Sequence, residues 1–371
     1  MRFGVFVVMA GRNAGGPETY EHGLIRSLAA LDQQNEYHIF CLNPPAADSF
    51  RLIQENISYH VLWPDIRWVS IPVSLPLALR RSRIDLLHAT YVPPPFSPTP
   101  YVFTLLDISM FTHPELYPPA IRWRLQKLVS RALQYARLIV CISQYTQDSV
   151  AEMFQTPAER LTTVHLGLQD SFRPVALEQA RQVLKQKYHI NYPYLLFVGS
   201  FVPRKNIVRV VEAFYHFRQE AKANVKLVLA GQKAWGAQEV NNTIERRQLR
   251  EHVIELNYVA DDDLPALYSG ANMLVFPSLN EGFGFPVLEA MACGAPVLTS
   301  NLTSLPEIAG GAALLVDPYS VEDIASNMHT LFSDAALRAS LREKGLERAK
   351  EFTWRHTAQR TLAAYHRALA L

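Results

Sequence analysis

The sequence has few cysteines and no long uncharged hydrophobic run. Its 371 residues include only Cys41, Cys141 and Cys293, which lie far apart in apolar segments. This spacing argues against a disulfide framework or a C-x-x-C zinc site and is typical of buried free thiols. The apolar segment 3–10 is too short for the core of a signal peptide, and no other segment reaches the roughly 18 residues needed to span a bilayer. We therefore expect a soluble, cytoplasmic protein.

The sequence also lacks a strong net charge. Its 36 Lys and Arg residues nearly balance 34 Asp and Glu residues, which leaves a formal charge of +2. No overall field therefore draws the chain to nucleic acid, and any basic surface must be local. With 49% hydrophobic and 19% charged residues, the chain can bury a sizeable core, and its length predicts two domains.

Apolar, β-branched-rich segments alternate with helical patterns in two separate series. The first series predicts strands over residues 5–9, 37–42, 86–88, 102–106 and 138–142. The second series predicts strands over residues 194–198, 225–230, 253–256, 273–276, 296–299 and 313–316. Because parallel βαβ units have this pattern, the sequence predicts two doubly wound α/β domains.

The turn-rich stretch 167–174 separates the two series and predicts the linker. We expect an N-terminal domain over residues 1–174 and a C-terminal domain over residues 175–352. Apolar residues at i, i+3, i+4 spacing predict three helices after the last strand. The last helix, within residues 353–371, is a candidate to pack back on the N-terminal domain.

The strongest chemical signal is the segment E-G-F-G-F-P-V-L-E at residues 281–289, which follows a predicted strand and opens a helix. Glu281 precedes the helix, where unpaired N–H groups and the positive end of the dipole can meet a phosphate or sugar, whereas Glu289 lies inside it. Gly282 and Gly284 let a ligand approach the backbone. Two glutamates are commonly just solvated, but the glycine context favours a ligand site.

Two further loops carry residue types that bind phosphate. The segment G-S-F-V-P-R-K-N at residues 199–206 follows a strand, and its adjacent Arg204 and Lys205 can neutralise a diphosphate unless they form an ordinary exposed basic turn. The loop G-R-N-A-G-G at residues 11–16 offers N–H groups to an anion. It lacks the G-x-G-x-x-G fingerprint, and no acidic residue closes the next strand, which disfavours a nicotinamide enzyme.

These motifs make the chain similar to the family 4 retaining glycosyltransferases over nearly its whole length, because their order and spacing both agree. Further matching segments are S-Q-Y-T at 143–146, Tyr258-Val259 and S-L-P-E at 304–307. The resemblance implies a GT-B fold: two Rossmann-like domains facing each other across a cleft, with the donor bound mainly by the C-terminal domain and the acceptor by the N-terminal domain. It implies a hexosyltransferase that moves a hexose, with GDP-mannose the expected donor, to a glycan or lipid-linked acceptor hydroxyl.

The resemblance also implies residue roles. Arg204 and Lys205 would stabilise the leaving diphosphate in place of a divalent metal, so that no metal or other cofactor is expected. Glu281 would bind donor sugar hydroxyls and would be a catalytic residue together with the two cations. Glu289 would bind the ribose hydroxyls. The acidic triplet 261–263 fits the start of a helix rather than a metal site. The remaining substrate-binding candidates are Gly15, Gly16, Ser143, Gly199, Tyr258, Val259, Gly282, Phe283, Gly284 and Phe285.

One position departs from the family pattern. The strand that often ends in a His-Asp pair here ends in Leu106-Asp107, and leucine cannot donate a hydrogen bond. Asp107, taken as a catalytic candidate, or His113 would compensate, or the sugar would sit differently, or the chain would be a weak catalyst. Two alternatives stay open: a GT-B sugar-nucleotide epimerase, and a catalytically weak partner subunit that binds nucleotide-sugar.

Residues 121–136 predict an amphipathic helix whose polar face is basic. Arg124, Lys127 and Arg131 share that face near Trp123. Such a face can lie on an anionic membrane, or it can be the solvated surface of an ordinary helix. Peripheral contact with the inner membrane face is therefore an expectation alongside the cytoplasmic location, and no nucleic-acid partner is expected.

Overall fold

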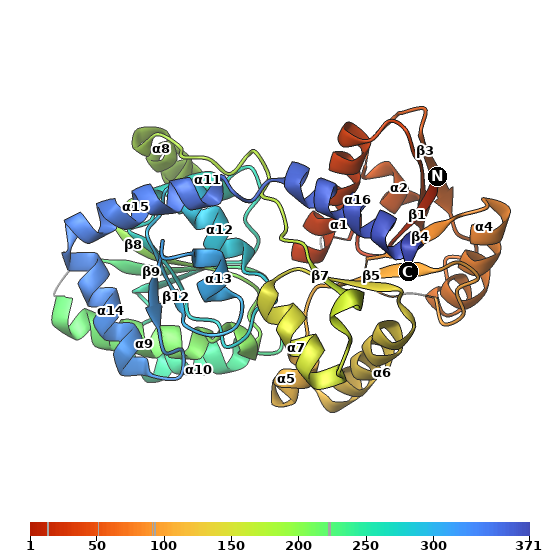
Figure 1. Cartoon of the computed structure of the whole chain (residues 1–371). Helices are drawn as coiled ribbons and strands as arrows, with labels where there is room; N and C mark the ends of the chain where they lie inside the picture. The colour runs from red at the N-terminus through yellow and green to blue at the C-terminus, as the bar shows by residue number, and fades with distance from the viewer. Residues whose placement is uncertain (13–14, 51, 91, 93, 222–223) are drawn as a thin grey trace. The chain divides into compact units, whose positions relative to one another are not determined.

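The computed structural model describes residues 1–12, 15–50, 52–90, 92, 94–221 and 224–371 (Figure 1). The chain divides into two units. The first unit comprises Met1–Gly167 with Phe352–Leu371, and the second comprises Leu168–Glu351. The stretch 167–174, where the sequence predicts the linker, begins at this division. Each unit is an α/β domain built on its own parallel sheet.

The first unit has a seven-stranded parallel sheet with the order β3-β2-β1-β4-β5-β6-β7. The strands are β1 (Arg2–Val7), β2 (Glu36–Cys41), β3 (Ile57–Val61), β4 (Leu86–Ala89), β5 (Tyr101–Leu105), β6 (Leu138–Cys141) and β7 (Leu161–Thr163). The central strands are buried along their length, which explains their continuous apolar sequences. The edge strands β3 and β7 alternate or mix polar residues, and the sequence analysis missed both.

Helices connect these strands. They are α1 (Gly16–Leu31), α2 (Pro44–Asp48), α3 (Arg67–Val69), the π-helix η1 (Ser70–Ser74), α4 (Leu75–Arg81), α5 (Ser109–Thr112), the 3-10 turns η2 (Pro114–Leu116) and η3 (Ala158–Arg160), α6 (Pro119–Tyr135) and α7 (Gln144–Phe154). The terminal helix α16 (Trp354–Ala370) also belongs to this unit and lies along α1 (Figure 1).

The contact between α16 and the sheet of the first unit depends on small and polar residues. A Cβ atom on Gly23 of α1 would lie 2.1 Å from the Trp354 ring, so only glycine leaves room for this indole. Tyr365 reaches the sheet interior, where its hydroxyl lies 2.6 Å from His88 Nδ1. His88 Nε2 lies 2.7 Å from Thr104 Oγ1 on β5. Burial lowers the pKa of His88 to about 3, so the imidazole is neutral.

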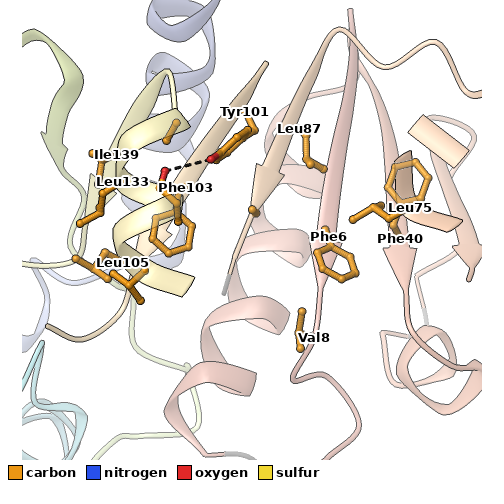
Figure 2. Packing of buried hydrophobic residues seen from close by; sticks show 14 of the residues in the cluster. Phe6, Val8, Phe40, Leu75, Leu87, Tyr101, Phe103, Leu105, Leu133 and Ile139 are labelled. Atoms are coloured by element: carbon orange, nitrogen blue, oxygen red, sulfur yellow. Dashed lines mark hydrogen bonds between the residues drawn. The ribbon is translucent and has the colours of Figure 1, made fainter. Parts of the chain in front are cut away.

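Buried hydrophobic side chains on one face of the first sheet form a single cluster (Figure 2). Its members come from the strands and from helices such as α4 and α6, and the Tyr101 hydroxyl donates to the carbonyl of Ala132 on α6 at 3.1 Å. The labelled members are Phe6, Val8, Phe40, Leu75, Leu87, Tyr101, Phe103, Leu105, Leu133 and Ile139.

The second unit has a six-stranded parallel sheet with the order β10-β9-β8-β11-β12-β13. Its strands are β8 (Tyr194–Val198), β9 (Lys226–Ala230), β10 (Val253–Leu256), β11 (Met273–Phe276), β12 (Val297–Ser300) and β13 (Leu314–Val316). Its helices are α8 (Leu177–Tyr188), the 3-10 turn η4 (Pro203–Lys205), α9 (Ile207–Ala221), α10 (Ala237–Arg246), α11 (Leu264–Gly270), α12 (Phe285–Ala292), α13 (Leu305–Ala309), α14 (Val321–Ser333) and α15 (Ala335–Ala349). Both sheets have the doubly wound, Rossmann-like order that the sequence predicts.

Candidate functional site

The candidate site lies where the loops after β8 and β11 meet. These strands are neighbours in the second sheet, so their carboxyl ends reach the same edge, which is where doubly wound sheets bind ligands. The carbonyl of Arg204, on the first loop, accepts a hydrogen bond from the backbone N–H of Leu279 at 2.8 Å, and Ser278 Oγ lies 2.9 Å from the same carbonyl oxygen. The second loop is thereby fastened to the first.

The loop after β8 holds its shape through Asn206 and two glycines. Asn206 has a φ of +62°, which asparagine tolerates better than most residues. Its buried amide donates to the carbonyls of Pro277 and Pro318 at 2.9 and 2.7 Å. A Cβ atom on Gly231, at the end of β9, would lie 2.1 Å from the Gly199 carbonyl oxygen. Gly199 is therefore part of a close backbone contact that orients the cationic turn.

The cationic turn surrounds Glu281. Lys205 Nζ lies 2.7 Å from Glu281 Oε1, and Arg204 Nη1 lies 3.0 Å from Oε2. Ser278 donates a hydrogen bond to Oε1 at 2.7 Å. Burial by itself would raise the pKa of Glu281, but the two cations outweigh it and lower this pKa to about 2. Glu281 is thus a carboxylate at neutral pH, and sequence reasoning missed Ser278 as one of its partners.

The glycine-rich loop leads from Glu281 into α12. Gly284 precedes the helix with a φ of +112°, and a Cβ atom there would lie 2.7 Å from Leu305 Cδ2. The Ser304 hydroxyl lies within hydrogen-bond distance of the carbonyl oxygens of Glu281 and Phe283, at 2.9 and 2.8 Å. Gly282 and Gly284 are buried, whereas Phe285 is partly buried. Contacts within the protein therefore hold this loop in place.

Glu289 lies within α12 and pairs with Tyr268 of α11. The Tyr268 hydroxyl donates to Glu289 Oε2 at 2.7 Å. Burial, together with the charge of Asp261, raises the pKa of Glu289 to about 7 against the opposing effects of the Tyr268 hydrogen bond and of Lys205. Glu281 and Glu289 therefore differ in protonation near neutral pH, although they stand on the same loop-helix segment.

The stretch before α11 holds the last candidates of the second unit. Tyr258 is 60% exposed, whereas Val259 is buried. Asp263 immediately precedes α11, and its carboxylate accepts hydrogen bonds from Lys187 at 2.7 Å and from Tyr188 at 2.8 Å. This carboxylate thus ties α11 to α8. Among the residues that the structure describes, no three His, Cys, Asp or Glu side chains gather in a way that could ligate a metal ion.

In the first unit, two glutamates of α1 accept hydrogen bonds from the backbone N–H groups that follow β1. Buried Glu21 accepts hydrogen bonds from the N–H groups of Val8, Met9 and Ala10 at 2.9, 2.9 and 2.7 Å. Glu18 accepts from the N–H of Gly11 at 2.8 Å. The prediction that loop 11–16 offers its N–H groups to an anion is therefore wrong for Gly11. The sequence analysis did not single out Glu21.

Gly15 and Gly16 mark the start of α1. Gly15 stands just before the helix with a φ of +66°, and a Cβ atom there would meet nothing within 4 Å. This open backbone leaves room for a ligand to approach. Residues 13 and 14 of the same predicted loop lie outside the described residues.

Ser143 and Asp107 lie beyond the carboxyl ends of β6 and β5. Ser143 is fully buried, and its hydroxyl accepts from the N–H of Thr146 at 3.1 Å as the N-cap of α7. Asp107 Oδ1 accepts from the N–H of Ser109 at 2.7 Å, and Tyr117 donates to Oδ2 at 3.4 Å. Through these contacts both side chains stabilise local structure. Their roles in substrate binding or catalysis stay predictions.

The described helices include none with both the length and the hydropathy required to cross a membrane.

Comparisons with known proteins agree with this arrangement. Residues 14–172 match the model of Glycosyltransferase Family 4, and residues 180–348 match that of Glycosyl transferases group 1. The chain is 36% identical over 265 residues to the O-antigen chain mannosyltransferase B of Escherichia coli, which covers 71% of this chain and 69% of that protein. It is 33% identical over 237 residues to the serotype-specific mannosyltransferase WbdA of Escherichia coli, across 63% of this chain but only 29% of that longer protein.

A solved structure extends the likeness over the whole fold. Sucrose-phosphate synthase from Thermosynechococcus elongatus has a TM-score of 0.80, with 21% sequence identity over 100% of this chain and 99% of its own. An identity this low supports the fold alone. With the two family matches and the bacterial relatives, however, it leaves one assignment: the chain belongs to the family 4 glycosyltransferases and has their GT-B fold.

Proposed function

We propose that the chain is a retaining, metal-independent mannosyltransferase that moves mannose from GDP-mannose to a hydroxyl of a glycan or lipid-linked acceptor in O-antigen-type polysaccharide synthesis. The two relatives described above are named as mannosyltransferases, which supports the sugar. The observation that carries the proposal is the cluster of Arg204, Lys205 and Glu281 directly before α12. It combines fixed cations, a carboxylate and a helix start without a side-chain cap at one sheet edge.

The cations account for departure of the nucleoside diphosphate. As the bond between the anomeric carbon and the diphosphate oxygen breaks, the electron pair stays on the diphosphate and its negative charge grows. Arg204 and Lys205 already stand in a largely buried, preorganised position, where cations stabilise developing charge far more than they do in water. They would supply the electrostatic stabilisation that a divalent metal supplies elsewhere.

Glu281 fits the binding of sugar hydroxyls better than proton transfer. Its pKa of about 2 makes it a poor general base and leaves it ionised at neutral pH. A carboxylate accepts strong, charge-assisted hydrogen bonds from hydroxyl groups. The acceptor oxygen would form its bond on the face from which the diphosphate departs, and a diphosphate oxygen would take the acceptor proton. Retention by this route requires no protein nucleophile.

The remaining roles follow the family resemblance. Glu289, oriented by Tyr268, would accept from the ribose hydroxyls, and the backbone at Tyr258 and Val259 would meet the base. Gly282, Phe283, Gly284 and Phe285 would present backbone to the sugar and phosphates, as would Gly15, Gly16, Ser143 and Gly199. Asp107 would act near the reacting carbon in place of the histidine that the family often has at the position of Leu106.

The location of the protein is part of the same proposal. We assign it to the cytoplasm, where nucleotide-sugars are its donors, with peripheral contact at the inner membrane face. Arg124 and Lys127 on α6 are exposed, and basic residues near an anionic surface each favour binding by about 1 kcal/mol.

A donor panel tests the proposal. Ligands that bind the folded state raise its melting temperature, so GDP-mannose should stabilise the chain more than UDP- or ADP-sugars do. Turnover with a trial acceptor, followed by NMR of the product, should then give an α-linked mannoside. Release of an epimerised sugar would favour the epimerase reading, and donor binding without any turnover would favour the inactive partner subunit.

A further inference from the structure

Each sheet has one point at which the strand order reverses. In the first sheet this point lies between β1 and β4, and in the second it lies between β8 and β11. Doubly wound domains bind ligands outside the carboxyl ends of the strands at such a point. In the second unit, Arg204, Lys205 and Glu281 meet there. In the first unit, the side chain of Glu21 occupies the corresponding position.

Glu21, on α1, joins the backbone after β1 to the residue that follows β4. Its Oε1 accepts a hydrogen bond from the N–H of Val8, and its Oε2 accepts from the N–H groups of Met9 and Ala10, at 2.9, 2.9 and 2.7 Å. The hydroxyl of Thr90, directly after β4, lies 2.6 Å from Oε1. One carboxyl group thus bridges the two strands at the reversal point.

The three N–H groups around Glu21 form an anion cradle. Successive N–H groups that converge on one point are a common means by which proteins bind anions. Glu21 is only 1% exposed. Burial raises the pKa of its carboxyl group, and the hydrogen bonds with Thr90 and with the three N–H groups oppose this rise. Burial of such a group costs free energy unless its contacts compensate, so the four contacts must be favourable enough to hold it there.

Helix α1 supports the backbone on both sides of the loop that precedes it. Glu18 lies three positions before Glu21 and therefore on the same side of the helix, and it accepts from the N–H of Gly11 at 2.8 Å. The carbonyl of Gly15 accepts from the N–H of Thr19 at 3.0 Å. A displacement of α1 from the end of β1 would therefore move Gly15, which the proposed function assigns to donor binding.

The occupied cradle also distinguishes the two units. While Glu21 accepts from residues 8–10, their N–H groups cannot donate to a phosphate. At the corresponding point of the second unit, Arg204 and Lys205 supply two cations. A diphosphate thus meets cations in the second unit and a carboxyl group in the first, which favours its binding to the second.

We propose that Glu21 is a positioning residue of the transferase. Its carboxyl group fills the anion cradle of the first unit, excludes phosphate from it, and holds the backbone that leads to Gly15 in the position that transfer requires. This role rests on the transferase function proposed above and deepens it, because it adds a residue that acts through the glycine loop and not by contact with substrate.

Glu21→Ala tests this role by removing the carboxyl group. The kcat with GDP-mannose and a trial acceptor should fall at least about tenfold, because a misplacement of about 1 Å can lower a rate by about 10². The Kd of GDP, measured by calorimetry, should stay within about twofold, because the proposed contacts of GDP lie in the second unit. Glu152→Ala, at an exposed glutamate of α7 in the first unit, should change neither constant.

Formate tests the cradle itself, since it has the carboxylate without the rest of the side chain. It should raise the melting temperature of Glu21→Ala and restore most of the lost kcat, whereas chloride at the same ionic strength should do neither. Glu21→Gln keeps the size of the side chain and guards against a failure of Glu21→Ala to fold. It should show the same split between kcat and GDP affinity, but formate should not restore it, because the amide fills the cradle.

All rates are measured well below the melting temperature of the least stable variant, where a residue that serves stability alone would leave kcat unchanged. An unchanged kcat in the folded Glu21 variants would overturn the proposal, as would a loss of GDP affinity equal to the loss of kcat, or no effect of formate on Glu21→Ala. If the parent chain itself transfers no mannose, the proposed function fails. The thermal shift that formate gives to Glu21→Ala needs no sugar nucleotide and still decides whether the cradle exists.

Discussion

Lys205 Nζ lies 2.7 Å from Glu281 Oε1, and both side chains are almost entirely buried. Taking two charges out of water costs free energy that a single contact recovers only with good geometry and further hydrogen bonds. Arg204 and Ser278 supply those further contacts to Glu281. A buried ionic cluster at a sheet edge, beside a helix start without a side-chain cap, is more easily explained by ligand binding than by stability.

Removal of either cation should impair chemistry more than donor binding. Arg204→Ala and Lys205→Ala are each expected to lower kcat by about 10²–10³, the range for loss of one group that stabilises developing charge, with a much smaller rise in donor KM. Steady-state kinetics with varied donor measure both constants. Lys350→Ala, an exposed cation of the same unit, is the control. An unchanged kcat in both variants would contradict the assignment.

Glu281 and Glu289 should fail differently when each is neutralised. Glu281→Gln should weaken the sugar nucleotide but not the free nucleoside diphosphate, because its role concerns the sugar. Glu289→Gln should weaken both ligands by a similar factor, because both contain the ribose. Replacing a charge-assisted hydrogen bond by a neutral one costs about 1–2 kcal/mol, or about 5- to 30-fold in Kd.

Calorimetry with the two ligands measures these factors directly. If Glu281→Gln weakens the nucleoside diphosphate as much as the sugar nucleotide, or if Glu289→Gln weakens neither, the roles taken from the family are wrong for this chain. The fold assignment would survive either result, since it does not depend on these side chains.

The two glutamates also give stability opposite dependences on pH. The pKa of Glu281 falls from 4.5 to about 2 on folding, so its contribution is present above 4.5 and is lost as the pH falls toward 2. The pKa of Glu289 rises from 4.5 to about 7, so its contribution is present below 4.5 and is lost as the pH rises through 7. As the pH rises from about 5 to 8, the free energy of unfolding of the ligand-free parent chain should therefore fall relative to that of Glu289→Gln. Urea denaturation of both proteins across this range measures the difference, and parallel curves would contradict the shifted pKa.

Chelation should not abolish transfer. The proposed stabilisation of the leaving diphosphate comes from Arg204 and Lys205, and the carboxylate of Asp263 is engaged with Lys187 and Tyr188. Activity in EDTA is expected to match activity with added magnesium within about twofold. Such a difference is smaller than the tenfold change in rate that about 1.4 kcal/mol of activation free energy gives. Complete loss in EDTA, with recovery on addition of magnesium or manganese, would show that the transferase requires a metal.

The sequence was sufficient for features that depend on local patterns. Buried central strands such as β8 and β11 have continuous apolar sequences, and the glycines, cations and glutamates of the two loops after them stand out in the chain. Edge strands escaped prediction because β3 (I-S-Y-H-V) and β7 (L-T-T) are short and partly polar. An edge strand needs only one partner and one buried face, so its sequence carries a weaker signal.

Long-range polar contacts could not be predicted from the sequence. In the sequence Glu21 looks like an ordinary residue of an amphipathic helix. In the structure its carboxylate accepts hydrogen bonds from three backbone N–H groups and from the Thr90 hydroxyl, the last at 2.6 Å. Tyr268 lies 21 positions from its partner Glu289 in the sequence. Such pairs depend on how helices and strands pack, and a single sequence contains no pattern that brings them together.

The contact of Tyr365 with His88 gives a last prediction, on the stability of the first unit. These residues are 277 positions apart, and their hydrogen bond of 2.6 Å is buried. Neutral His88 has two ring nitrogens, of which Nε2 lies beside Thr104 and Nδ1 has the Tyr365 hydroxyl as its partner.

Tyr365→Phe keeps the ring and removes only this hydroxyl. An unpaired buried polar group costs about 1–3 kcal/mol, so urea denaturation should show a loss of that size. Measurements about two pH units above 6.5, the unshifted pKa of histidine, keep His88 neutral in the unfolded chain as well. Tyr319→Phe, at a tyrosine that is 51% exposed in the second unit, should change the free energy of unfolding by less than about 0.5 kcal/mol. Equal stability of Tyr365→Phe and the parent chain would mean that α16 is held to the sheet by apolar packing alone.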